Sequence, residues 1–200
     1  MVRKITSIFF SFLRENNPSS NWTVKQTILH TNYTVEISLT LNKVFAMKFL
    51  QTFILFLVLN FGALGIGSIF TNRGVVSDWY QNLSKAPWTP PGWVFGAAWT
   101  TIMICFAFYI AYLWPQVDNR RVLLILFVLQ WLLNVSWNPV FFYYHNVRLG
   151  LLIIVALTFL VGYFMLKFWP DLGVKSTLIL PYFLWLLIAT SLNAYVAFKN

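Results

Sequence analysis

Five long apolar stretches, none with a charged side chain near its centre, constrain this chain more than any other feature of its sequence. A helix of about 20 apolar residues crosses a bilayer with its backbone polar groups satisfied internally. On that basis we expect spans near residues 48–70, 92–114, 122–144, 149–169 and 176–198. The sequence therefore predicts an all-α integral membrane bundle of five transmembrane helices.

The charge content agrees with this prediction and excludes several function classes. Only 10% of the 200 residues are charged, against about a quarter in soluble domains. Ion-coupled pumps usually carry charged side chains at mid-depth, so their absence here argues against a proton- or sodium-driven mechanism. The net charge of +9 comes from basic residues dispersed at helix ends, a pattern that indicates membrane topology and no nucleic-acid partner.

The connections between the predicted spans indicate how the bundle is arranged. Three of them are short, so successive helices should be antiparallel neighbours. The exception is 71–91, which is rich in proline and aromatic residues. We expect it to be a structured loop between the first two helices that acts as a lid over one end of the bundle.

Residues 1–46 differ from the remaining sequence, since they are polar and contain the breaker cluster 16–20. We expect residues 1–46 to be a poorly ordered N-terminal extension and residues 47–200 to be the membrane domain. Near the membrane, six basic residues lie on the N-terminal side of the bundle and four on the other. This asymmetry favours a cytoplasmic N-terminus.

Polar and aromatic residues form stripes along three predicted helices. In the third, Gln130, Asn134 and Trp137 share one face. Similar stripes are Trp99, Met103, Phe106 and Ile110 in the second helix, and Pro181, Trp185, Ala189 and Asn193 in the fifth. Together they predict an aromatic cavity with a few amide groups, suited to a flat apolar ligand. The alternative is that the amides only join helices and the rings fill space.

Other chemistries find little support in the sequence. It contains no metal-ligand cluster, glycine-rich phosphate loop or serine–histidine–acid set, so we expect no catalytic residues, no metal site, no required cofactor and no conventional enzyme cycle. His145 is an unpromising haem ligand because no second histidine is near it in the sequence, and an interfacial histidine is the better interpretation.

Three sequence blocks resemble one known family. They are Trp79 to Thr100, Leu133 to Phe142, and Leu180 to Asn193, in order and with their spacing intact. This pattern resembles the tryptophan-rich sensory protein and translocator protein family (TspO/MBR, the peripheral benzodiazepine receptor family), and the resemblance covers residues 47–200. The chain departs from the family's usual Lys-Pro at Lys85-Ala86, which leaves the loop backbone less well defined.

The resemblance implies a pocket for porphyrin, haem, sterols and synthetic aromatic ligands in a five-helix bundle that is often a homodimer. By position, its ligand-binding residues would be Trp79, Tyr80, Trp99, Met103, Asn134, Trp137, Trp185 and Ala189. We expect a membrane binding protein, sensor-like or transporter-like, that is closed by the 71–91 loop and lies in the inner membrane if bacterial. The alternatives are a light-dependent porphyrin-degrading enzyme that uses Trp99 and Trp185, and a purely structural membrane scaffold.

Overall fold

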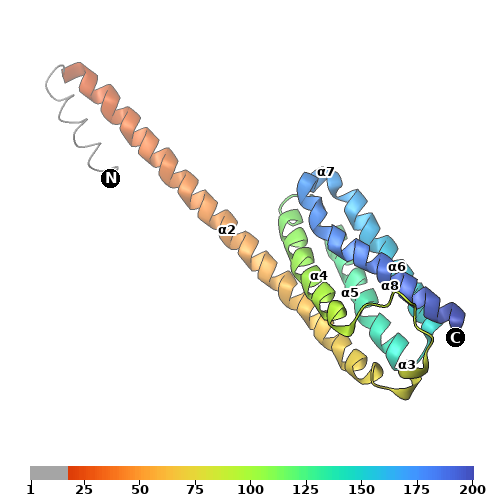
Figure 1. The fold of residues 1–200 in the computed structure, drawn as a ribbon. Coiled ribbons are helices and arrows are strands. Elements are labelled where there is room, and N and C mark those ends of the chain that lie inside the picture. Colours follow the sequence, from red (N-terminus) through yellow and green to blue (C-terminus); the bar gives the residue numbers. More distant parts are fainter. Residues whose placement is uncertain (1–17) are drawn as a thin grey trace. The chain divides into compact units, whose positions relative to one another are not determined.

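The computed structural model describes the backbone of residues 18–200 and the side chains from residue 25 onward, and this part of the chain contains helices and no strand. It comprises two units that meet between Lys48 and Phe49. The helices are α2 Pro18–Gly74, α3 Asp78–Asn82, α4 Gly92–Leu113, α5 Arg120–Phe142, α6 Val147–Lys167, α7 Trp169–Leu172, the 3₁₀ helix η1 Gly173–Ile179, and α8 Leu180–Lys199, and Figure 1 labels all of them except η1.

The second unit is a bundle that confirms the predicted fold class. Five helical segments of the described chain are long and apolar enough to cross a membrane. Asn119 and Asn146 fix where α5 and α6 begin, because each side chain accepts a hydrogen bond from the backbone N–H three residues later. These caps place both helices two residues earlier than the sequence pattern indicated.

The last predicted span, 176–198, is not one regular helix. Gly173 has a φ of 55°, a conformation that suits glycine, and it ends the short helix α7. A 3₁₀ segment follows, and α8 then begins with Pro181 in its first turn, where proline's missing N–H costs nothing. The span therefore starts four residues later than expected as α-helix.

The predicted extension, residues 1–46, is helical from Pro18 onward, and its first 17 residues lie outside the described part of the chain. That this segment is a poorly ordered extension stays a prediction. Its sequence is polar but contains no proline between Pro18 and the bundle, so nothing in the backbone interrupts a helix there.

Aromatic packing forms the core of the bundle and leaves few polar groups inside it. Phe106 lies at the centre, 5.5–6.1 Å from the rings of Tyr109, Phe127, Phe164 and Tyr182. The α6 helix packs against α5 and α8, while α4 packs against η1 and α8. This packing brings the predicted stripes of α4, α5 and α8 toward one space inside the bundle.

Candidate ligand-binding site

A small cavity lies inside the bundle between α4, α5, α6 and α8. Its volume is about 50 Å³. It is lined by Phe95, Trp99, Asn134, Trp137, Ile154, Leu157, Trp185, Leu186 and Ala189. Five of the eight predicted ligand-binding residues are in this set, and they come from three different helices.

Trp99 and Trp185 contribute the two cavity indoles from α4 and α8. The Trp185 ring meets Phe95 edge-to-face at 5.3 Å, and the Trp99 ring meets Tyr182 edge-to-face at 6.0 Å. Trp185 is 7% exposed, and its Nε1–H is buried without a hydrogen-bond partner. A buried indole N–H usually finds an acceptor, so this group is free to bind an acceptor atom of a ligand.

Asn134 supplies the second polar group of the cavity wall. Its side chain is 8% exposed and makes no hydrogen bond to the described residues, although its backbone carbonyl accepts one from Asn138. Burying an amide group without hydrogen-bond partners in a membrane bundle costs free energy unless a ligand or a water molecule supplies the missing hydrogen bonds. The cavity therefore combines apolar rings with one free amide and one free indole N–H.

Trp137 has a different role from the other two cavity tryptophans. Its Nε1 donates to Asn193 Oδ1 at 2.9 Å, and Asn193 Nδ2 donates to the Val147 carbonyl at 3.0 Å. This chain of bonds joins α5, α8 and the start of α6. Asn193 therefore joins helices, as the alternative interpretation of the polar stripes proposed. The Asn134 side chain makes no such bond to the described residues.

Trp79 and Tyr80 do not line the cavity, although they lie close to its outer wall. Trp79 stacks on His145 at 4.1 Å and meets Phe141 at 5.6 Å, while Tyr80 meets Phe142 at 5.5 Å. The rings of Phe141 and Phe142 in turn contact Trp137, at 5.0 and 5.8 Å. The rings of Trp79 and Tyr80 are therefore connected to the cavity wall by contacts through Phe141 and Phe142 to Trp137. Direct ligand contact by Trp79 and Tyr80 stays a prediction.

Met103 is the eighth predicted residue, and the structure places it in the core and not on the cavity wall. It is 2% exposed and belongs to the same cluster as Phe106 and Tyr182. Trp99 lies one helical turn earlier in α4 and covers the cavity side, so Met103 lies one layer deeper.

Four cavity residues were not predicted: Phe95, Ile154, Leu157 and Leu186. Two of them lie on α6, whose central part is apolar except for a single threonine, Thr158. Only a polar or aromatic stripe distinguishes an inward face from a lipid-facing one in such a helix. The close packing of Gly150 on α6 was not predicted either. A Cβ added at this position would lie 3.3 Å from Asn193 Oδ1, so α6 and α8 are in close contact there.

The loop predicted at 71–91 begins at residue 75, because α2 continues to Gly74. Hydrogen bonds attach this loop to the C-terminal part of the bundle. Ser84 N–H donates to Asn200 Oδ1 at 2.8 Å, and Asn200 Nδ2 donates back to the Ser84 carbonyl at 3.3 Å. Further along, Trp88 Nε1 donates to Ser191 Oγ at 3.1 Å. We call the Ser84–Asn200 pair the latch. These bonds hold the loop over the bundle end where α4 begins and α5 and α8 end.

Tyr80 is the loop residue whose electrostatics are perturbed. Burial raises the pKa of its phenol, because the phenolate would lose hydration. Lys85 Nζ lies 4.6 Å from the centre of the Tyr80 ring, a cation–π contact that fits a neutral phenol. The loop therefore packs around an un-ionised tyrosine at neutral pH.

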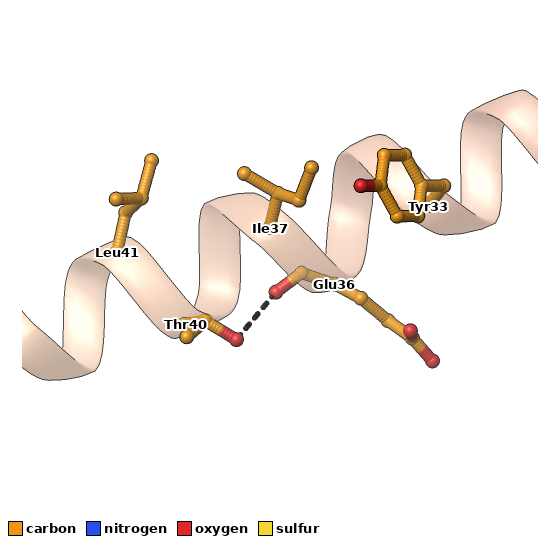
Figure 2. Close-up of a pocket in the computed structure, with 5 residues that line it drawn as sticks. All are labelled: Tyr33, Glu36, Ile37, Thr40 and Leu41. Carbon is orange, nitrogen blue, oxygen red and sulfur yellow. Dashed lines mark hydrogen bonds between the residues drawn. The ribbon is translucent and has the colours of Figure 1, made fainter.

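A second hollow lies on the surface of the first unit and is not a comparable site. It is lined by Tyr33, Glu36, Ile37, Thr40 and Leu41, all from one helix. Figure 2 shows Tyr33, Ile37 and Leu41 along one side of α2, with Glu36 pointing away from them and Thr40 Oγ1 donating to the Glu36 carbonyl at 2.8 Å. Side chains of a single helix do not enclose a ligand.

Comparison with known proteins decides the family. The model of the TspO/MBR family matches residues 53–199, nearly the whole bundle. The chain belongs to this family. With its five apolar helices, this TspO/MBR protein is a multi-pass membrane protein.

Several curated members of the TspO/MBR family are similar to the chain. The tryptophan-rich protein TspO of Archaeoglobus fulgidus is 35% identical over 136 residues, which are 67% of this chain and 87% of that protein. The corresponding protein of Chlorobaculum tepidum is 34% identical, over 64% of this chain and 82% of its own length. The human translocator protein is 27% identical, over 64% and 78%. The sequence blocks that suggested the family all lie within the matched region.

Proposed function

We propose that this TspO/MBR protein binds a flat, mostly apolar ligand of the porphyrin type in the bundle cavity, as a sensor or transporter. One observation carries the proposal: Trp99, Asn134 and Trp185, from three helices, line one cavity, in which Trp185 Nε1 is buried without a partner among the described residues and the Asn134 side chain makes no hydrogen bond to them. Indole faces stack on planar rings, and the two polar groups orient the ligand.

The cavity volume requires that binding is accompanied by opening. Pockets for drug-sized ligands are about 300–1,000 Å³, whereas this cavity is about 50 Å³. The structure is therefore a closed form, and a porphyrin enters only when side chains or the loop move. Trp99 is only partly buried and donates no hydrogen bond to the described residues, so its side chain can move without breaking one.

Quenching of tryptophan fluorescence by protoporphyrin IX tests the proposal in purified protein. We expect saturable quenching in the natural protein and an affinity at least tenfold weaker after Trp99→Phe with Trp185→Phe. Trp169→Phe is the matched control, because Trp169 is 47% exposed and lies in α7, away from the cavity. Equal affinity of the double variant and the control would place binding elsewhere.

A second candidate function is light-dependent degradation of a bound porphyrin, favoured by the presence of two indoles on the same cavity wall. Oxidation would start from the excited pigment with oxygen as the oxidant, and the protein would supply tryptophans that donate electrons. Illuminating the complex in air and following the main porphyrin absorption band tests this reaction. Equal loss in the Trp99→Phe, Trp185→Phe variant would exclude a role for these indoles.

We also propose that the protein forms a homodimer in the cytoplasmic membrane, if its source is bacterial. Helical spans support this location, since outer-membrane proteins are built as strand barrels. Mass measurement of the detergent-solubilised protein tests the dimer, and membrane fractionation tests the location.

A further inference from the structure

A pair of polar side chains lies directly beneath the cavity, one helical layer farther from the loop. Gln130 precedes Asn134 by one turn on α5, and Tyr182 precedes Trp185 by about one turn on α8, so the pair lies about 6 Å deeper. Gln130 Nε2 donates to the Tyr182 hydroxyl at 2.7 Å. Both side chains are almost completely buried, at 2% and 1% exposed.

The Gln130–Tyr182 pair leaves one polar atom unsatisfied. Gln130 Oε1 is buried without any hydrogen-bond partner among the described residues. Only two other buried side-chain atoms share that state in the described chain, and one of them is Trp185 Nε1 on the cavity wall. Replacing both partners by apolar residues, leucine at 130 and phenylalanine at 182, would join the helices without an unsatisfied atom, so the amide needs a reason beyond packing.

Tyr182, the hydrogen-bond partner of Gln130, is one ring contact away from the cavity wall. The Trp99 ring lines the cavity and meets Tyr182 edge-to-face at 6.0 Å, so it forms the cavity floor on that side. The cavity is too small for the proposed ligand, and the partly buried Trp99 ring can move without breaking a hydrogen bond to the described residues. Its displacement would join the cavity to the layer that contains Gln130, Tyr182 and Met103.

We propose that the ligand site continues beneath Trp99 to Gln130, whose Oε1 accepts a hydrogen bond from a neutral O–H or N–H group on the leading edge of the ligand. This inference rests on the proposed function and specifies the ligand class: a flat apolar body that carries a hydrogen-bond donor. A sterol hydroxyl has this chemistry, and so has the O–H of an un-ionised carboxylic acid side chain at the rim of a porphyrin. Trp185 Nε1 binds an acceptor of the same ligand one layer higher.

Matched probes with and without the donor test the subsite by microscale thermophoresis on the full chain. One arm compares cholesterol with its 3-methyl ether, and the other compares protoporphyrin IX, whose un-ionised propionic acid groups carry an O–H at the rim, with its dimethyl ester, which lacks that O–H. We expect the donor-bearing probe of at least one pair to bind about tenfold more tightly, as one neutral hydrogen bond provides. The arm that discriminates identifies the source of the donor.

Substitutions distinguish a direct ligand contact by Gln130 from a role in which Gln130 only joins two helices. In Gln130→Leu, the donor-bearing and donor-free probes should bind with about equal affinity. Ser176→Ala removes another unpartnered buried atom, in η1, and should keep the preference for the donor-bearing probe. If Gln130→Leu does not fold, Tyr182→Phe provides the test, because it frees Gln130 Nε2 as a donor. The affinity for the methyl ether should then rise severalfold.

Three results would overturn the inference: binding without discrimination in either pair, tighter binding of the methyl ether by the natural protein, or a preference that persists in Gln130→Leu. An unchanged affinity for the ether in Tyr182→Phe would also count against it. Failure of every probe to bind saturably would instead refute the proposed function itself. The two failures are therefore distinguishable in one set of titrations.

Discussion

At the scale of single residues, two cavity tryptophans differ in the surroundings of one atom, and this difference gives opposite predictions. Trp185 Nε1 has no partner, whereas Trp137 Nε1 donates to Asn193 Oδ1. Trp185→Phe should keep the ring contacts and leave the melting temperature unchanged or higher, with weaker ligand binding. Trp137→Phe should destabilise the protein by roughly 0.5–2 kcal/mol, because it leaves the Asn193 oxygen unpaired.

Thermal unfolding of both tryptophan variants in the same detergent, together with porphyrin titration, checks this pair of predictions. A Trp185→Phe variant that is less stable than Trp137→Phe would contradict them. The comparison controls for the loss of indole area, since both substitutions remove the same atoms from the interior of one bundle.

Gly67 provides a second prediction at this scale. A Cβ on Gly67 would lie 2.6 Å from Asn138 Nδ2, and Asn138 Oδ1 accepts a hydrogen bond from Thr71 at 2.7 Å. Gly67→Ala should therefore separate α2 from α5 and cost about 1–3 kcal/mol of unfolding free energy. Gly65→Ala is the control, because nothing lies within 4 Å of its added Cβ. Equal stability of the two variants would contradict the predicted close contact.

At the scale of elements, the latch gives a prediction about the motion of the loop. Asn200→Ala removes both of its bonds to Ser84, together with the bond from Asn200 Nδ2 to the Val196 carbonyl one turn earlier in α8. We expect faster amide hydrogen exchange over residues 77–90 and faster ligand association, with little change in the melting temperature. Phe198→Ala is the matched control, since its side chain is 83% exposed. Unchanged exchange in Asn200→Ala would show that the aromatic contacts alone hold the loop.

The elements also show which parts of the fold and site the sequence can predict. Hydropathy located the spans, because crossing a bilayer requires length and apolarity that no other role in the chain requires. Stripes identified Trp99, Asn134 and Trp185 because each is polar or aromatic in an aliphatic helix. The α6 wall and the deeper position of Met103 were not predictable, since apolar side chains look alike on every face. Gly173 and Pro181 shifted the last helix for reasons of backbone geometry.

At the scale of the whole bundle, basic residues over aromatic rings are more numerous at the end opposite the loop than in the loop, where Lys85 lies over Tyr80. Arg120 lies 5.5 Å from the Trp114 ring, and Lys175 lies 4.4 Å from that of Tyr112. Such pairs suit the membrane interface, where rings and cations both anchor a helix end. Six of the ten basic residues near the membrane lie on this side of the bundle. We therefore expect this end of the bundle to face the cytoplasm and the loop to face outward.

Labelling of a single cysteine in intact cells checks this orientation. In a Cys105→Ala background, Ser84→Cys should react with a membrane-impermeant maleimide, because Ser84 is exposed in the loop. Asp118→Cys, in the connection at the opposite end, should react only after lysis. The reverse pattern would show that the bundle inserts the other way.

The small volume of the closed cavity has a thermodynamic consequence. If ligand binds only to a rare expanded conformer, the observed dissociation constant is the intrinsic one divided by the fraction of molecules in that conformer. A 1% population would weaken apparent binding about a hundredfold. Substitutions that never touch the ligand, such as those in the latch, would then strengthen binding by raising this population, so affinity could evolve or be regulated from the loop alone.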